Sequence, residues 1–78
     1  MPWYSYIAGR QDSGNPNNYT YVGSTPPSCP SNKLYLCAIQ AQDNLGAPDL
    51  TNINLFIEIA NAINNRVEST NVKLRPTP

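Results

Sequence analysis

The sequence contains no histidine, and charged side chains make up only 13% of its 78 residues. Histidine is the side chain that most often acts as a general acid or base near neutral pH, and it is the commonest metal ligand. The acidic residues are scattered, and no glycine-rich phosphate loop is present. The sequence therefore predicts a protein that is not an enzyme and that holds no metal or cofactor.

The few charges also balance, with five basic and five acidic residues. Proteins that bind nucleic acid or an anionic membrane surface usually carry a basic patch, which this composition does not provide. No apolar run approaches the roughly 20 residues that a bilayer-spanning helix needs. We therefore expect neither nucleic-acid binding nor membrane insertion. A net charge near zero favours association between copies.

Only two cysteines are present, Cys29 and Cys37. In an exported chain an even number of cysteines predicts a disulfide, which here would contribute on the order of 2–3 kcal/mol by closing a short loop. Two thiolates without histidine cannot complete a zinc shell, and the spacing is not that of a Cys-x-x-Cys redox pair. Two buried free thiols remain the alternative.

The composition resembles that of extracellular proteins, because polarity comes from Asn, Ser, Thr and Gln, with eight Pro and five Tyr. No signal peptide is recognisable at the start of the sequence. We interpret the chain as a processed product; if Met1 is the true start, the absence opposes export. The run Asn18-Tyr19-Thr20 is an N-glycosylation acceptor, so Asn18 is a candidate for modification in a secretory system.

One stretch, residues 49–67, has the periodicity of an amphipathic helix. Its main apolar stripe has the spacing of a buried helix face and consists of Leu50, Ile53, Phe56, Ile57, Ala60, Ile63 and Val67. A second apolar set lies beside that stripe and consists of Leu55, Ile59 and Ala62. We expect the main stripe to pack on the rest of the chain and the second set to contact a neighbouring subunit. The alternative is that both sets are core.

Four short segments rich in aromatic and β-branched residues predict strands, at residues 3–8, 19–22, 34–41 and 71–75. The third segment is almost continuously apolar, which indicates a central strand buried on both faces. Its period of two places Cys37 on the same side as Tyr35 and Ile39. The sequence therefore predicts one small α+β domain over residues 1–78. In it, a mostly antiparallel sheet of about four short strands packs on one helix, with one disulfide.

Several short segments, taken in order, resemble small uncharacterised exported two-cysteine proteins of Bacteroidetes. The resemblance rests on residues 15–19 (Asn-Pro-Asn-Asn-Tyr), Cys29, residues 36–39 (Leu-Cys-Ala-Ile), the helix, and residues 69–75 (Ser-Thr-Asn-Val-Lys-Leu-Arg). It implies an envelope or extracellular location. It implies no activity and assigns no functional residue.

These observations together predict an exported structural protein that self-associates, as the repeating subunit of an extracellular filament. The expected contacts between copies are apolar residues of the helix and of the terminal strands: Leu55, Ile59, Ala62, Trp3, Tyr4, Tyr6, Val72 and Leu74. A monomeric secreted module that binds a glycan or peptide through surface aromatics is one alternative. A small inhibitor or toxin-like protein that presents the loop between the cysteines is another.

Overall fold

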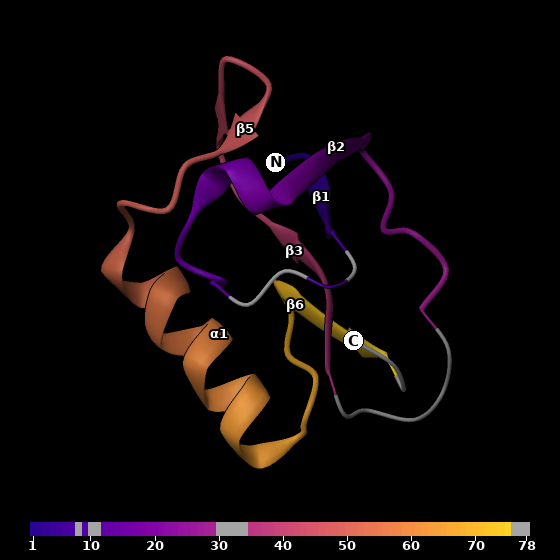
Figure 1. The fold of residues 1–78 in the computed structure, drawn as a ribbon, viewed down its shortest axis with the longest axis vertical. Helices are drawn as coiled ribbons and strands as arrows, with labels where there is room; N and C mark the ends of the chain where they lie inside the picture. Colours follow the sequence, from indigo (N-terminus) through magenta and orange to yellow (C-terminus); the bar gives the residue numbers. More distant parts are fainter. Residues whose placement is uncertain (8, 10–11, 30–34, 76–78) are drawn as a thin grey trace.

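The computed structural model describes residues 1–7, 9, 12–29 and 35–75 (Figure 1). The elements are β1 (Trp3–Tyr6), a 3-10 helix η1 (Pro16–Asn18), β2 (Tyr19–Gly23), β3 (Tyr35–Gln40), β4 (Asp43–Asn44), β5 (Ala47–Pro48), α1 (Ile53–Asn65) and β6 (Val72–Arg75). Four strands form an antiparallel sheet in the order β2-β1-β3-β6, and β4 pairs with β5 in a separate hairpin. The predicted α+β class is confirmed.

All four predicted strands are present, and their ends differ from the prediction by at most two residues. Residues 8 and 34, which the prediction placed in strands, lie outside the described residues. The two inner strands are β1 and β3. Tyr4 of β1 lies opposite Tyr21 of β2 and Ile39 of β3, and Ile39 in turn lies opposite Val72 of β6.

The main core lies between α1 and one face of the sheet. Its buried members are Tyr4, Tyr6, Tyr19, Leu36, Ile39, Ala41, Leu55, Ile59, Ala62, Val72 and Leu74. Every strand of the four-stranded sheet contributes to this set, as does the helix. Burial of apolar surface is the dominant favourable term in folding, so this layer supplies most of the stability of the domain.

A smaller cluster of Trp3, Cys37 and Ala38 lies apart from the main core, with Cys29 packed against it. The pairing of β3 with β6 shifts between Leu36 and Ala38, which makes Cys37 an extra residue in β3. Such a bulge interrupts the alternation of side chains between the two faces. Cys37 therefore packs with Ala38, and the prediction that it shares a side with Ile39 is wrong. Burial of β3 on both faces is confirmed.

Local hydrogen bonds make α1 shorter than the predicted 49–67. The Asn52 side chain accepts hydrogen bonds from the backbone N–H groups of Asn54 and Leu55, at 3.0 and 3.4 Å, and so caps the first turn. At the other end Arg66 adopts a left-handed conformation with φ of 56°. The N–H of Val67 then donates to the carbonyl of Ala62 at 3.2 Å, which closes the helix.

The prediction of which helix face packs on the sheet is wrong, although Leu50 and Ile63 of the predicted stripe are partly buried against the core. Leu55 and Ile59 are 6% and 1% exposed in the core, whereas Ile53 and Ile57 of the predicted core stripe are 66% and 51% exposed. The observed orientation also places Glu58 beside the segment that leads into β6, where its carboxylate accepts three hydrogen bonds. Turning the main stripe inward would carry Glu58 to the outside and leave these donors unpaired.

The orientation of α1 is testable with one substitution made at two positions. Ile59→Ala removes a buried side chain and should lower the free energy of unfolding by about 2–5 kcal/mol. Ile57→Ala is the matched control on the exposed face and should change it by less than about 0.5 kcal/mol. Urea denaturation at low protein concentration measures both. A larger loss at position 57 than at position 59 would contradict the orientation described.

The bridge between Cys29 and Cys37 is testable by mass spectrometry of the unreduced protein. Alkylation without reductant should leave the mass unchanged, and alkylation after reduction should label both cysteines. Replacing both by serine should lower the free energy of unfolding by on the order of 2–3 kcal/mol, because the unfolded chain is then less restricted. Labelling of the unreduced protein would disprove the bridge.

Candidate functional site

The predicted disulfide is present between Cys29 and Cys37, whose Cα atoms are 6.2 Å apart. Cys29 precedes β3 by several residues, and the bridge anchors it to the bulge in that strand. Trp3 and Ala38 belong to the same cluster as the two bridged cysteines. The bridge therefore stabilises this smaller cluster and is a structural element of the fold.

The structure places all the predicted assembly residues inside the protomer. Each is 8% exposed or less: Leu55, Ile59, Ala62, Trp3, Tyr4, Tyr6, Val72 and Leu74. The strand residues are buried because β1 is paired on both sides and because β6 belongs to the protomer's own sheet. The expectation that these side chains face a neighbouring copy is therefore corrected: they hold a single protomer together.

Asn18 is also in the interior, with 6% of its surface exposed. Its amide nitrogen, which would carry a glycan, donates a hydrogen bond to the carbonyl of Asp12 at 2.7 Å. The backbone carbonyl of Asn18 accepts a hydrogen bond from the backbone N–H of Ile7 at 2.9 Å. The folded protein does not present this side chain for glycosylation, which corrects the expectation from the acceptor motif.

The surface of α1 that faces away from the sheet is apolar. We call Ile53, Phe56, Ile57 and Ala60 the outer stripe; all four are exposed, and the first three are 66%, 46% and 51% exposed. No described element lies beyond α1 on the side away from the sheet (Figure 1). Gly14 lies beside the Phe56 ring, and the rest of the outer stripe is an apolar surface that the described part of the protomer leaves open.

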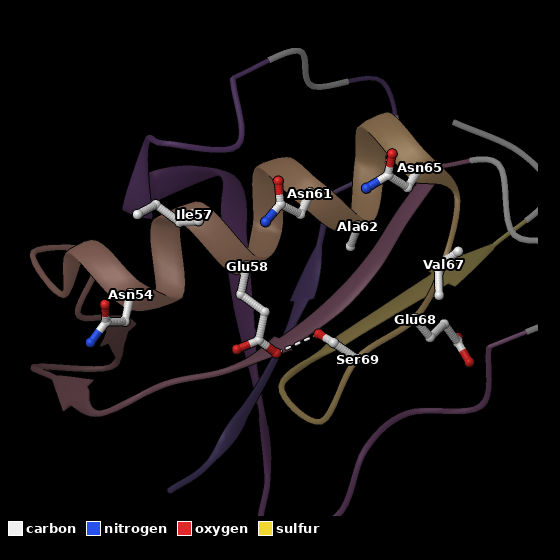
Figure 2. A pocket seen from close by; sticks show the side chains of 9 residues that line it. All are labelled: Asn54, Ile57, Glu58, Asn61, Ala62, Asn65, Val67, Glu68 and Ser69. Carbon is white, nitrogen blue, oxygen red and sulfur yellow. Dashed lines mark hydrogen bonds between the residues drawn. The ribbon is translucent and has the colours of Figure 1, made fainter.

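A groove of about 480 Å³ runs beside the outer stripe, between α1 and the segment that follows it (Figure 2). Three exposed amides line it, those of Asn54, Asn61 and Asn65. Their side chains have no hydrogen-bond partner among the residues described. Ile57 and Val67 add apolar surface to the same groove. Glu58 and Glu68 also line it, so the groove offers amide donors and acceptors and two carboxylates next to apolar side chains.

Glu58 is the only charged residue of α1, and it is fully engaged within the protomer. Its carboxylate accepts hydrogen bonds from the hydroxyl of Ser69, from the backbone N–H of Asn71 at 2.9 Å and from the amide of Asn71 at 3.2 Å (Figure 2). Burial acts to raise the pKa of Glu58, but these hydrogen bonds outweigh it and hold that pKa below its ordinary value. The outer stripe is left without a charge.

Most aromatic side chains serve the core and are not available as surface contacts. Burial, together with the hydrogen bond that Tyr4 donates to Asp43 at 2.5 Å, raises the pKa of Tyr4. Burial likewise raises the pKa of Tyr19, which donates to the carbonyl of Ser13 at 2.7 Å. Trp3 and Tyr6 are also buried. These four side chains are therefore not available to a binding surface, whereas Tyr21 and Tyr35 are 54% and 45% exposed.

Within the described ranges, no group of three or more His, Cys, Asp and Glu side chains is placed to hold a metal ion. No helix in this part of the chain is long and apolar enough to span a membrane. No protein-family model, curated protein or solved structure matches the chain. The outer stripe of α1 is the candidate site on structural grounds alone.

The engagement of Glu58 predicts a specific loss of stability in acid. Because the pKa of Glu58 is lowered by folding, its contribution is fully present above the ordinary glutamate pKa of about 4.3 and is lost as the pH falls through the lower folded value. Glu58→Gln should therefore be less stable than the native protein at pH 7, and the difference should shrink at pH 3. Urea midpoints at both pH values measure it. A difference that stays constant would contradict this role of the carboxylate.

Proposed function

We propose that this is an exported structural protein that self-associates and forms the repeating subunit of an extracellular filament. The observation that carries the proposal is the outer stripe, in which Ile53, Phe56 and Ile57 are about half exposed or more on one uncovered helix face. Single exposed apolar residues are ordinary on protein surfaces, but adjoining ones mark places where a partner binds. A partner would remove this surface from water.

The neutrality of the protein supports a second copy as that partner. The net charge is zero, so no long-range repulsion opposes association of identical chains. The one charge on α1, that of Glu58, is held by Ser69 and Asn71 on the inner side of the helix. A charged partner would find no counter-charge on the outer stripe, whereas a copy presents the same apolar surface.

Growth of a pair into a filament needs a second contact surface. The two edges of the sheet differ in how readily they could pair with another chain. The edge strand β6 carries Lys73 and Arg75, and charged residues discourage pairing between sheet edges. The other edge strand, β2, contains no charge and no proline. The β4–β5 hairpin packs near β2, yet Thr20, Tyr21 and Val22 remain exposed. Strand addition at β2 is the second contact in this proposal.

Export is supported by the bridge between Cys29 and Cys37. Disulfides persist in oxidising compartments and at the cell surface, and they are rare in the cytosol. A small domain such as this one also benefits from a covalent link, because its core is limited in size. An extracellular location accounts for both features.

A second candidate function is a monomeric secreted module that binds a neutral glycan or peptide. The amides of Asn54, Asn61 and Asn65 favour it, since each offers two N–H donors and a carbonyl acceptor in a groove of suitable size. Titration with oligosaccharides or extended peptides, followed by NMR, tests this function. Chemical-shift changes confined to the groove residues, in a protein that stays monomeric, would favour the binding module over self-association.

Self-association through the outer stripe is tested by placing a charge in it. Ile57→Glu should weaken association by at least about tenfold, which corresponds to about 1.4 kcal/mol, because an unpaired carboxylate would have to be desolvated. Leu45→Glu is the matched control, since Leu45 is fully exposed in the turn between β4 and β5. Sedimentation velocity over a wide range of concentrations measures association.

Negative-stain electron microscopy of the same proteins tests the filament. Native protein and the Leu45→Glu control should form filaments, and Ile57→Glu should not. If the native protein remains monomeric at every concentration, the proposed function is wrong. If Ile57→Glu assembles as the native protein does, the contact lies elsewhere on the surface.

A further inference from the structure

The outer edge of β6 is closed by the segment of chain that leads into it. We call residues 67–69 the strap; it follows α1, and a turn at Thr70 and Asn71 joins it to β6 (Figure 1). We propose that the strap is an autoinhibitory contact, which closes the β6 edge against strand addition and is kept in place by the hydrogen bond that Glu68 accepts. This edge is a different surface from the outer stripe, and its closure does not depend on contacts there.

The pairing of β6 with β3 determines which backbone groups of β6 point outward. The N–H of Gln40 in β3 donates to the carbonyl of Asn71 at 2.8 Å, so the backbone of Asn71 faces β3. Hydrogen-bonded and non-hydrogen-bonded pairs alternate along an antiparallel ladder. Lys73 therefore faces β3 as well, whereas the backbone groups of Val72 and Leu74 are directed toward the outer edge.

The strap binds these outward groups. The N–H of Val72 donates to the carbonyl of Ser69 at 3.4 Å, and the N–H of Ser69 donates back to the carbonyl of Val72 at 3.1 Å, which makes an antiparallel bridge. The N–H of Leu74 donates to the carboxylate of Glu68 at 2.9 Å. An added strand would need the same backbone groups, so it cannot pair with them while the strap is in place.

A side chain makes the bond to Leu74 because the backbone of the strap has already turned away from the edge. Continuing the bridge beyond Ser69 would place Val67 opposite Leu74. The N–H of Val67 donates instead to the carbonyl of Ala62, where it closes α1. Glu68 thus supplies the acceptor that the backbone does not, and one carboxylate controls access to this part of the edge.

The helix holds the strap from the other side. Glu58 accepts hydrogen bonds from the hydroxyl of Ser69 and from the backbone N–H of Asn71 at 2.9 Å (Figure 2). The end of the strap and its turn are therefore anchored to α1, and Glu68 provides the separate anchor to β6. Removing the second anchor should loosen the strap without detaching the turn from the helix.

The partner that the strap excludes is β2 of a second copy. β2 is the opposite edge of the same sheet; it carries no charge and exposes Thr20, Tyr21 and Val22. The two edges are different surfaces, so their pairing would be heterologous and could add copies to the sheet without limit. With the β6 edge closed, β2 is left as the open edge of the four-stranded sheet.

Hydrogen exchange followed by NMR tests whether Glu68 holds the strap. In Glu68→Ala the amide of Leu74 should exchange at least about tenfold faster than in the native protein, because its acceptor is lost, while the amide of Lys73 should keep its rate. Glu68→Gln retains an acceptor oxygen and should restore slow exchange. Asp49→Ala is the matched control, since it removes the same charge and a carboxylate that accepts the N–H of Thr51, outside β6.

Sedimentation velocity tests whether the strap protects the edge. Glu68→Ala is combined with Ile57→Glu, so that the outer stripe does not contribute to association. The combined variant should associate at a concentration at least about tenfold lower than Ile57→Glu alone, because an open sheet edge pairs readily with another strand. Asp49→Ala in the same background should cause no such change.

Each other result would overturn the proposal. If the exchange of Leu74 is unchanged, Glu68 does not hold the strap. If Leu74 and Lys73 exchange faster together, the substitution loosens the whole strand and the role of Glu68 is only structural. If Leu74 alone exchanges faster but association does not increase, the strap does not protect the edge. The proposed function is tested separately, by Ile57→Glu against the native protein, so the two can fail independently.

Discussion

The rotation of α1 about its own axis decides what this protein presents to its surroundings. Leu55, Ile59 and Ala62 pack on the sheet, and Glu58 accepts hydrogen bonds from Ser69 and Asn71 at the entry to β6. Both contacts hold the helix in one orientation, since a turn in either direction would expose apolar surface or leave buried donors unpaired. The exposure of the apolar outer stripe is the consequence of this orientation.

The rest of the fold supports this orientation. The two inner strands bring Tyr4 and Ile39 into the core with the helix residues, and Tyr19 of β2 joins them. Asp43 of β4 accepts a hydrogen bond from Tyr4. The bulge at Cys37 turns that residue toward Trp3, where the disulfide links it to Cys29. A chain of this size has little core to lose. We therefore interpret the bridge as the element that makes a 78-residue domain stable enough to expose an apolar helix face.

The sequence predicts the strands, the helix and the disulfide well, because periodicity, β-branched residues and paired cysteines are local signals. It fails on the helix face because the main apolar stripe has seven members, whereas the second set has only three, Leu55, Ile59 and Ala62. The deciding partners of Glu58 lie more than ten residues away, and no local pattern shows them. The bulge at Cys37 and the burial of Asn18 depend on tertiary pairing in the same way.

The central claim is that the outer stripe of α1 is the surface at which copies of this protein meet. The most direct test is a series of amide NMR spectra recorded over a range of protein concentrations. We expect chemical shifts and line widths to change with concentration for residues from Ile53 to Asn64 and to stay constant for the sheet face opposite the helix. Spectra that do not depend on concentration, or changes confined to that opposite face, would contradict the account.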